Sequence, residues 1–225
     1  MKAHLVVGMI HTVPALVGTF EDLVQAGAPG ALVLHVADPW LLRTAIESGV
    51  SDAVRQRVAA HAAHLAAQGA QAVLVTCSSI GETVVDAAAV AGIPVLRVDA
   101  PMATAAVELA TAHGASGRIA VLATLESTVG PTGRLVAEAV GRAGANVAVQ
   151  PSVVPGAADA RAASDHAGHD AAVRRAVHDA ARRSDVVVLA QASMACALDG
   201  AELPVPVLTS PAGGVQALLE RVRAR

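Results

Sequence analysis

The sequence predicts an α/β protein made of two pseudo-symmetric halves, each a parallel sheet flanked by helices. Short runs of valine, leucine and isoleucine alternate with alanine-rich segments along the chain, a pattern typical of buried parallel strands covered by helices. Three pairs of similar positions also recur at nearly one spacing: Cys77 and Gln191 stand 114 positions apart, as do His4 and Arg118, and Pro94 and Pro206 stand 112 apart. This recurrence indicates an internal duplication.

Composition limits what the protein can bind. Of the 225 residues 54% are hydrophobic, yet there is one Phe, one Trp and no Tyr, so the core must be aliphatic. The net charge of −3 and the lack of aromatic residues among basic ones argue against a nucleic-acid partner. The hydrophobic residues fall in runs far shorter than the roughly 20 residues that span a membrane, so we expect no membrane insertion.

The location in the cell follows from the cysteines and from the start of the chain. Cys77 and Cys196 are too few for a disulfide framework or a metal knuckle. The first four residues lead directly into a predicted strand, without the apolar region of a signal peptide. We therefore expect a cytoplasmic protein with reduced thiols.

The elements of the first half alternate between strand and helix. Ser51 is a suitable N-cap for the longest helix, and Gly69 ends it. In chain order we predict a strand at 4–10, a helix at 19–25, a strand at 31–36, a helix at 51–68, a strand from 72, a helix at 82–91 and a strand at 94–98. This order favours a parallel sheet.

The second half repeats the alternation. We predict a strand at 118–124, a hydroxyl-rich loop at 125–128, a helix at 134–142, a strand at 146–149, a loop at 151–165, a helix at 169–183, and strands from 185 and 205. The last helix, 213–223, should pack on the first half. The predicted halves are therefore 1–100 plus 208–225, and 101–207, with the seam near 100–117.

Cys77 is the strongest candidate for chemistry. It follows a buried strand and precedes Ser78, Ser79 and a predicted helix, so it should lie at the carboxyl edge of a sheet, where ligands bind. Backbone N–H groups of the two serines and the helix dipole should favour a thiolate. The alternative is that Cys77 is a small buried apolar residue.

Two similar halves predict a cleft in which each half contributes one residue to opposite sides of a bound molecule. This geometry allows a proton to be removed from one face of a carbon and returned on the other. His11, after the first strand, could tune Cys77 or hold a substrate oxygen, although it could equally be a packed loop histidine. Five further histidines should lie on solvated faces, and the spacing of the two His-x-x-His pairs among them offers no complete metal site: His61, His64, His166, His169 and His178.

The chain resembles the aspartate/glutamate/hydantoin racemase superfamily, which includes arylmalonate decarboxylase and maleate isomerase. The resemblance rests on residues 73–81, 119–124 and 187–194 and runs nearly end to end. It implies catalysis without a cofactor by one cysteine from each half. Cys77 occupies the first position, but Gln191 occupies the second, and an amide cannot transfer protons near neutral pH. Cys196 lies five residues further on and should face the core.

This departure leaves several functions open. The leading hypothesis is a racemase or isomerase that transfers a proton at the α-carbon of a small carboxylic or amino acid through Cys77. A single-cysteine decarboxylase, a cis-trans isomerase of a dicarboxylate and a non-catalytic carboxylate-binding protein are alternatives. The resemblance also implies a homodimer or larger homo-oligomer. The candidate substrate-binding residues are His11, Thr12, Ser78, Ser79, Thr124, Thr128, Gln191 and Ser193.

Overall fold

The chain divides into two units, each built on its own sheet. The computed structural model describes residues 5–198 and 202–224. The predicted strand start at His4, and the ends of the predicted first half at 1–4 and 225, lie outside the described residues. The first unit contains the described residues up to Asp99 and from Pro211 onward, and the second contains those between Ala100 and Ser210.

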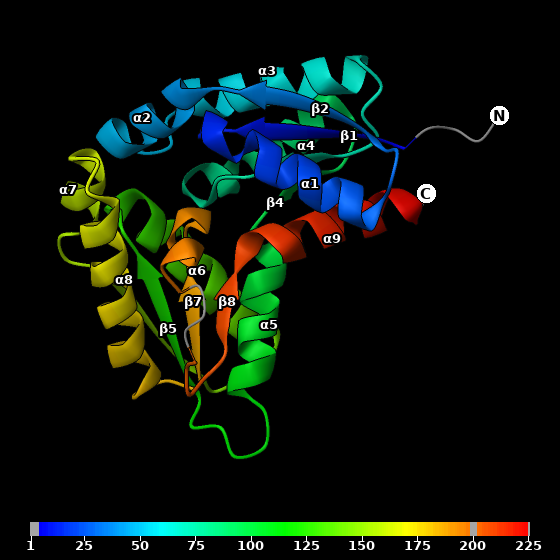
Figure 1. Ribbon diagram of the computed structural model, residues 1–225. Helices are drawn as coiled ribbons and strands as arrows, with labels where there is room; N and C mark the ends of the chain where they lie inside the picture. Colours follow the sequence, from blue (N-terminus) through cyan, green and yellow to red (C-terminus); the bar gives the residue numbers. More distant parts are fainter. Residues whose placement is uncertain (1–4, 199–201, 225) are drawn as a thin grey trace. The chain divides into compact units, whose positions relative to one another are not determined.

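The first unit holds a four-stranded sheet in the order β2-β1-β3-β4 (Figure 1). Its strands are β1 (Val6–His11), β2 (Leu32–Ala37), β3 (Val73–Val75) and β4 (Val95–Arg97). All the pairings are parallel, with Ile10 opposite Val75 and Val75 opposite Arg97. The carboxyl ends of these strands therefore lie at one edge of the sheet, and β1 and β3 are neighbours there.

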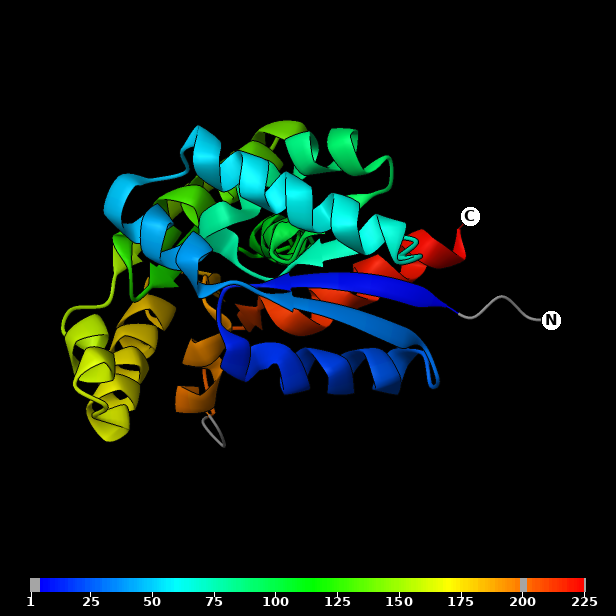
Figure 2. The same ribbon diagram turned by 90° about the horizontal axis from the view of Figure 1, so that it is seen from above.

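Helices cover both faces of this sheet (Figure 2). Phe20 and Leu218 bury α1 (Val17–Gly27) and α9 (Ser210–Arg223) against one face. Leu41, Val58 and Ala87 bury helices against the other face, namely α2 (Pro39–Ser48), α3 (Asp52–Ala67) and α4 (Val84–Ala91). Short 3₁₀ helices follow β1, at Pro14–Leu16, and β3, at Ser78–Thr83. Because both faces are covered, the strands are almost wholly apolar.

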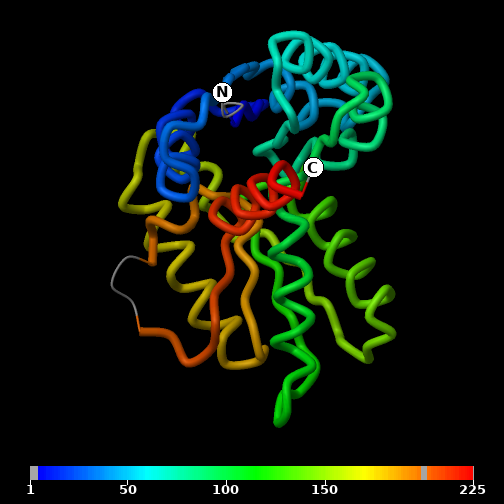
Figure 3. Tube along the Cα trace, turned by 90° about the vertical axis from the view of Figure 1, so that its right-hand side faces the viewer, coloured from blue at the N-terminus to red at the C-terminus, as the bar shows by residue number. Residues whose placement is uncertain are grey.

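The second unit repeats this arrangement, with the sheet order β6-β5-β7-β8 and parallel pairing throughout. Its strands are β5 (Arg118–Ala123), β6 (Ala148–Val153), β7 (Val186–Leu189) and β8 (Val207–Thr209). One face packs against α5 (Ala100–Ala110) and α6 (Glu126–Arg142). The other packs against α7 (Ala157–Ala162), α8 (His166–Ala181) and the 3₁₀ helix Ala192–Leu198. Figure 3 shows α8 in yellow and α5 in green on either side of the strands. The predicted α/β class, with two parallel sheets flanked by helices, is confirmed.

Several predicted elements were wrong in extent. Two helices lie where we predicted none: α5 within the segment 100–117, and α2 directly after β2. Asp38 caps α2 by accepting a hydrogen bond from the Trp40 amide, with Pro39 at the first helical position. Both are recognised helix-start signals. We gave them too little weight because Pro39 looked like the end of the strand.

The predicted loop 151–165 is also wrong. β6 continues through Pro151 to Val153, and α7 follows it. Proline is tolerated because β6 is an edge strand and needs no ladder donor on its free side. The predicted loop 125–128 is mostly helix, because α6 begins at Glu126 and runs through Pro131.

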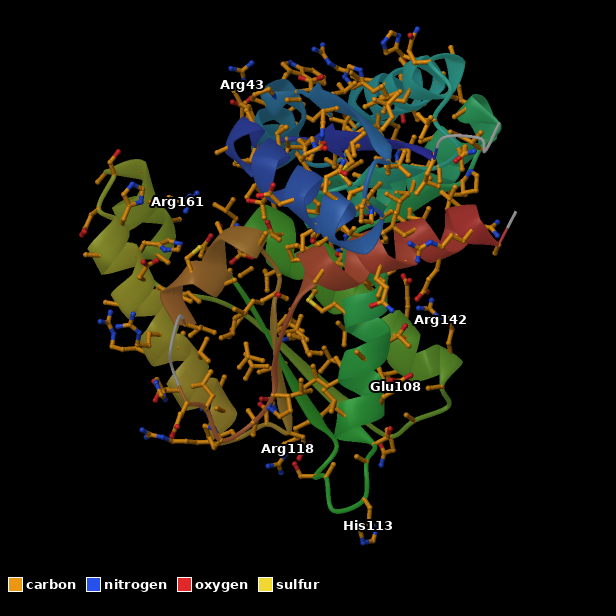
Figure 4. The ribbon with its side chains drawn as sticks, turned by 45° about the vertical axis from the view of Figure 1, so that its right-hand side comes forward. Arg43, Glu108, His113, Arg118, Arg142 and Arg161 are labelled. Atoms are coloured by element: carbon orange, nitrogen blue, oxygen red, sulfur yellow. The ribbon has the colours of Figure 1, made fainter. Side chains whose placement is uncertain are left out.

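Many charged side chains lie on the outside of the two units. The residues labelled in Figure 4 are exposed and point away from the sheets: Arg43, Glu108, His113, Arg118, Arg142 and Arg161. In the part of the chain that the structure describes, no helix combines the length and the apolar character needed to cross a bilayer.

Gly214 allows α9 to approach the end of β4 closely. A Cβ atom there would lie 2.7 Å from the carbonyl oxygen of Val98 and 3.0 Å from its Cα. Since backbone atoms cannot move aside cheaply, we expect Gly214→Ala to lower the free energy of unfolding by about 1–3 kcal/mol, the usual cost of overpacking. Chemical denaturation measures this.

Gly141→Ala is the matched control. Gly141 lies in α6 with open space around its Cα, so alanine should stabilise the helix by about 0.5–1 kcal/mol. Equal effects of the two substitutions would show that the contact with Val98 does not limit the packing of α9.

Candidate active site

Thr12 and Cys77 follow the last paired residues of two neighbouring strands. Ile10 of β1 pairs with Val75 of β3, and the Thr76 amide continues the ladder by donating to the Ile10 carbonyl at 3.0 Å. One step further, the Thr12 hydroxyl hydrogen-bonds to the Cys77 sulfur. The parallel sheet therefore brings together two residues that are 65 positions apart in the sequence.

Four donors surround the Cys77 sulfur: the Thr12 hydroxyl, the Ser79 hydroxyl and the backbone amides of Ser79 and Ile80. The side chain is only partly exposed. Burial raises the pKa of Cys77, and the four hydrogen bonds offset this increase only in part. The thiol is therefore neutral at physiological pH, and four hydrogen-bond donors are already in place to stabilise the thiolate when it forms.

The predicted thiolate was wrong for a structural reason. We expected the start of the helix predicted at 82–91 to act on the sulfur through a turn at Ser78 and Ser79, whereas a six-residue 3₁₀ helix follows Cys77 and α4 begins at Val84. The effect of a helix dipole falls off within one turn, so α4 adds little at the sulfur. The amides that reach the sulfur belong to Ser79 and Ile80 rather than to Ser78 and Ser79.

The second unit holds an equivalent pair at the end of β5 and β7. Leu122 pairs with Leu189, and two positions later on each strand stand Thr124 and Gln191. The Gln191 amide oxygen accepts hydrogen bonds from the Thr124 amide at 2.6 Å and from the Thr124 hydroxyl at 3.0 Å. This fixes the side-chain amide and leaves its NH₂ group as the donor for a ligand.

The register shows that the two pairs are equivalent. Thr12 and Cys77 stand two positions beyond the pair Ile10–Val75, as Thr124 and Gln191 stand two positions beyond Leu122–Leu189. In each unit a threonine on the first strand holds the candidate residue on the third. Gln191 therefore takes the place in the second unit that Cys77 has in the first.

His11 is not in a loop, as predicted, but is the last residue of β1 and wholly buried. Its Nδ1 lies 3.0 Å from the Thr76 hydroxyl, and its Nε2 lies 2.9 Å from Nδ1 of His35. Burial, with a smaller effect of His35, lowers the pKa of His11 to about 4, so the ring is neutral. Both ring nitrogens are thus engaged by neighbouring side chains of the first unit.

The remaining predicted binding residues lie beside these pairs in the sequence. Ser78 and Ser79 are buried in the 3₁₀ helix after Cys77, and Thr128 is buried in the first turn of α6. Ser193 is partly exposed in the 3₁₀ helix after Gln191. The structure thus puts each in the segment that follows a candidate strand end.

Two acidic residues at strand ends have structural partners. Asp99 is fully buried and accepts hydrogen bonds from Arg97 Nε at 2.6 Å and Nη2 at 2.9 Å. Asp38 lies between Arg57 and His61, at 2.5 and 2.7 Å. Burial alone would raise the pKa of Asp38, but its hydrogen bonds with both partners lower it overall. Arg97 is therefore already paired with Asp99.

Other expectations are corrected. Cys196 is exposed and does not face the core, because it lies on the outer side of a 3₁₀ helix. His169 is buried rather than solvated. Among the described residues no group of three or more His, Cys, Asp or Glu side chains could hold a metal ion.

Sequence reasoning missed Glu21, His35, Thr76 and Ile80. Glu21 and His35 connect to His11, Thr76 lies between His11 and the Ile10 carbonyl, and Ile80 contributes an amide to the sulfur. One signal was available, because a histidine at position 35 interrupts an apolar strand. The Ile80 amide left no signal, since backbone donors are independent of residue type.

A family model described as Asp/Glu/Hydantoin racemase matches residues 7–218. No curated relative matches the sequence.

Solved structures share the fold at low identity. Glutamate racemase from Bacillus anthracis is similar at 16% identity and a TM-score of 0.73, covering 100% of this chain and 83% of that one. Picrophilus torridus aspartate racemase is 11% identical with a TM-score of 0.68, covering 97% and 94%. Arylmalonate decarboxylase is 20% identical with a TM-score of 0.61, covering 96% and 92%. Since the family model spans nearly the whole sequence, this chain belongs to the Asp/Glu/hydantoin racemase family.

Proposed function

We propose that the protein is a cofactor-independent enzyme of the racemase or isomerase type. In this enzyme the Cys77 thiol transfers a proton at the α-carbon of a small carboxylic or amino acid. The observation that carries this proposal is the neutral, partly exposed thiol at the end of β3 with four donors around its sulfur. Family membership supports the same class of reaction.

The thiolate form of Cys77 acts first as a base: the C–H bond at the α-carbon breaks, its electron pair forms the enediolate, and an S–H bond forms. The thiol then acts as an acid, when its S–H bond breaks and a C–H bond forms again at the α-carbon. The negative charge moves to sulfur, where the donors from Thr12, Ser79 and Ile80 stabilise it. One group thus serves as both acid and base.

A decarboxylase is the second candidate, and Gln191 favours it. Inversion at a carbon requires a proton donor on each face, and an amide held by Thr124 cannot supply one. In a decarboxylation the bond to the departing CO₂ breaks, its electron pair forms the enediolate, and Cys77 alone returns a proton. Addition of Cys77 to a double bond, as a cis-trans isomerase needs, is disfavoured because burial raises the thiol pKa.

The substrate-binding residues proposed are those that carry hydroxyl or amide donors. Thr12, Ser78, Ser79, Thr124, Thr128, Gln191 and Ser193 supply them, and such donors bind a carboxylate without an arginine. That both strand ends act on one molecule, that the protein forms a homodimer or larger oligomer, and that it is cytoplasmic stay predictions. Light scattering tests the oligomer.

NMR in D₂O tests the proposal with aspartate, glutamate, hydantoins, malonates and maleate as substrates. We expect α-hydrogen exchange or loss of CO₂ with at least one of them, and loss of that activity in Cys77→Ala. Conversion that is unchanged in Cys77→Ala would overturn the proposal. Unchanged spectra with every compound, together with an unreactive thiol, would instead support a carboxylate-binding protein.

Gln191→Cys tests the role of the second position. If both strand ends act on one molecule, a second thiol there should convert exchange with retention into exchange with inversion. Chiral chromatography of the recovered substrate measures this. Gln191→Ser is the control, because it also removes the amide but adds no group able to transfer a proton. Inversion by the wild-type protein would show that some other group already performs the second transfer.

A further inference from the structure

A chain of hydrogen bonds runs beneath the end of β3, from Glu21 through His35 and His11 to Thr76. Glu21 Oε2 lies 2.9 Å from His35 Nε2, His35 Nδ1 lies 2.9 Å from His11 Nε2, and His11 Nδ1 lies 3.0 Å from Thr76 Oγ1. The Thr76 hydroxyl also lies 3.2 Å from the Ile10 carbonyl. The chain therefore links α1, β2, β1 and the residue directly before Cys77.

One end of this chain is open to solvent and the other is closed. The Glu21 side chain is 38% exposed and that of His35 is 18% exposed, whereas His11 is fully buried against Phe20. The hydrogen bond from His35 lowers the pKa of Glu21, so its carboxylate is ionised and Nε2 of His35 carries a hydrogen. The Glu21–His35 pair is therefore the end of this chain that solvent protons can reach.

Other charged groups on the same elements face elsewhere. Asp38, at the end of β2, is engaged by Arg57 and His61 of α3. On α9, Arg223 donates to the Gly27 carbonyl at the far end of α1. On α1, Gln25 donates to Glu21 and is uncharged. Among the described residues of the first unit, the charged or titratable groups in contact with the two rings are thus Glu21 and the rings themselves.

The distances fit two proton arrangements. With His35 neutral, its Nδ1 accepts from His11 Nε2–H, and His11 Nδ1 accepts from the Thr76 hydroxyl. With His35 protonated, its Nδ1–H donates to His11, whose hydrogen is then on Nδ1 and donates to Thr76. The Thr76 hydroxyl then donates to the Ile10 carbonyl, the contact already present at 3.2 Å. One proton therefore reverses the two hydrogen bonds between His35 and Thr76 and turns the Thr76 hydroxyl toward the Ile10 carbonyl.

Two members of the hydrogen-bond chain directly precede the two residues that form the Thr12–Cys77 hydrogen bond. Thr76 precedes Cys77, and His11 precedes Thr12, whose hydroxyl donates to that sulfur. A hydroxyl that ties Thr76 to the Ile10 carbonyl fixes β1 and β3 together one position before both residues. The charge on protonated His35 also favours the thiolate form of Cys77.

The fold itself does not need these groups. In the second unit the pair one step beyond Leu122–Leu189 is Ala123 and Ala190, where the first unit has His11 and Thr76. The position equivalent to His35 holds Pro151, since Pro151 pairs with Val121 as His35 pairs with Met9. The same sheet therefore forms with alanine and proline at these places, which argues for a role other than folding.

We propose that His11 and His35 are positioning residues for Cys77, and that uptake of one proton by His35 reverses the Glu21–His35–His11–Thr76 chain and sets the environment of the thiol. This inference rests on the role proposed above for Cys77. His35, Glu21 and Thr76 act through Cys77 and Thr12 and do not touch the substrate.

Long-range ¹H–¹⁵N NMR of the histidine rings tests the reversal. Between pH 5 and 8, where histidines exchange protons, His11 should change from its Nε2–H form to its Nδ1–H form while staying neutral. In His35→Gln the His11 form should no longer change with pH, and in Glu21→Gln the change should move to lower pH. A double variant, His11→Ala with Thr76→Ala, carries the alanines that the second unit has at these positions. The ring signal that disappears in this variant is that of His11. A His11 form that is constant in the wild type would overturn the proposal.

Alkylation of Cys77 by iodoacetamide tests whether the reversal reaches the thiol. The measurement uses a Cys196→Ser background, because Cys196 is exposed. The logarithm of the alkylation rate should rise by one for each pH unit. At the acid end, where His35 is protonated, the rate should lie about threefold above the line extrapolated from higher pH, because protonated His35 lowers the pKa of Cys77 by about half a unit. This offset is the step that the variants test. The step should vanish in His35→Gln and persist in His64→Gln, a control on the exposed side of α3. A step that is absent, or present in both variants, would overturn the link to Cys77.

Neither readout needs a substrate, so the two proposals can fail separately. A step in alkylation with turnover that survives Cys77→Ala would refute the proposed function and leave the hydrogen-bond chain standing. Turnover that needs Cys77, without a step in the alkylation rate or a change in the His11 ring, would refute only the proposed reversal of the hydrogen-bond chain.

Discussion

Replacing Cys77 by serine is expected to lower the rate of α-proton transfer by about 10²–10⁴-fold, the usual contribution of a general acid or base. A hydroxyl holds its proton far more tightly than a thiol, while the four donors around the side chain should remain. The measurement is ²H incorporation or CO₂ release under single-turnover conditions. Cys196→Ser is the matched control, because that thiol is exposed and lies in the other unit.

The pH profile separates the two roles of the thiol. Because burial raises the pKa of Cys77, the protonated form persists beyond the ordinary titration near about 8.5. A reaction limited by proton donation should thus be constant from neutral pH and fall only as the pH rises through the raised value. Exchange limited by proton removal needs the thiolate and should rise over the same range. A rate that rises as the pH falls below neutrality, with folding intact, would contradict both roles.

Removing the carboxylate of Asp99 is expected to lower the free energy of unfolding of the first unit by about 3–5 kcal/mol. Asp99→Ala leaves the Arg97 guanidinium without its partner, and the Arg97 side chain is only 15% exposed. An uncompensated buried charge costs this much. The guanidinium also packs against Gly81, where a Cβ would lie 2.9 Å from Arg97 Cζ. The 3₁₀ helix after Cys77 should therefore loosen as well.

Chemical denaturation measures the loss, with Asp86→Ala as the control. Asp86 also pairs with an arginine, but its side chain is 55% exposed and that of Arg55 is 34% exposed, so the cost should stay below about 1 kcal/mol. The double variant Arg97→Met with Asp99→Leu should regain most of the stability, because no unpaired charge is then left buried. If Asp99→Ala cost no more than Asp86→Ala, the ion pair would not be what holds this strand end.

The site was predictable where it depended on the strands. Cys77 and Gln191 each follow a buried apolar run, and parallel strands end at one edge of a sheet, so both could be placed at strand ends. Their hydrogen-bond partners were not predictable. Thr12 and Thr124 reach these side chains because β1 pairs with β3, and β5 with β7, in one register, which no local pattern encodes.

The sequence by itself determined the α/β class, the repeated halves and the position of Cys77 at a strand end, because strand and helix periodicities are local and the duplication is visible in the residues. Only the tertiary structure decided the state of the thiol. Burial raises the pKa of Cys77 while donors from Thr12, Ser79 and Ile80 oppose it, and this balance depends on all the groups packed around the sulfur. The connection of His11 to His35 and Glu21 is likewise tertiary, since it joins three elements through side chains that are 10, 14 and 24 positions apart.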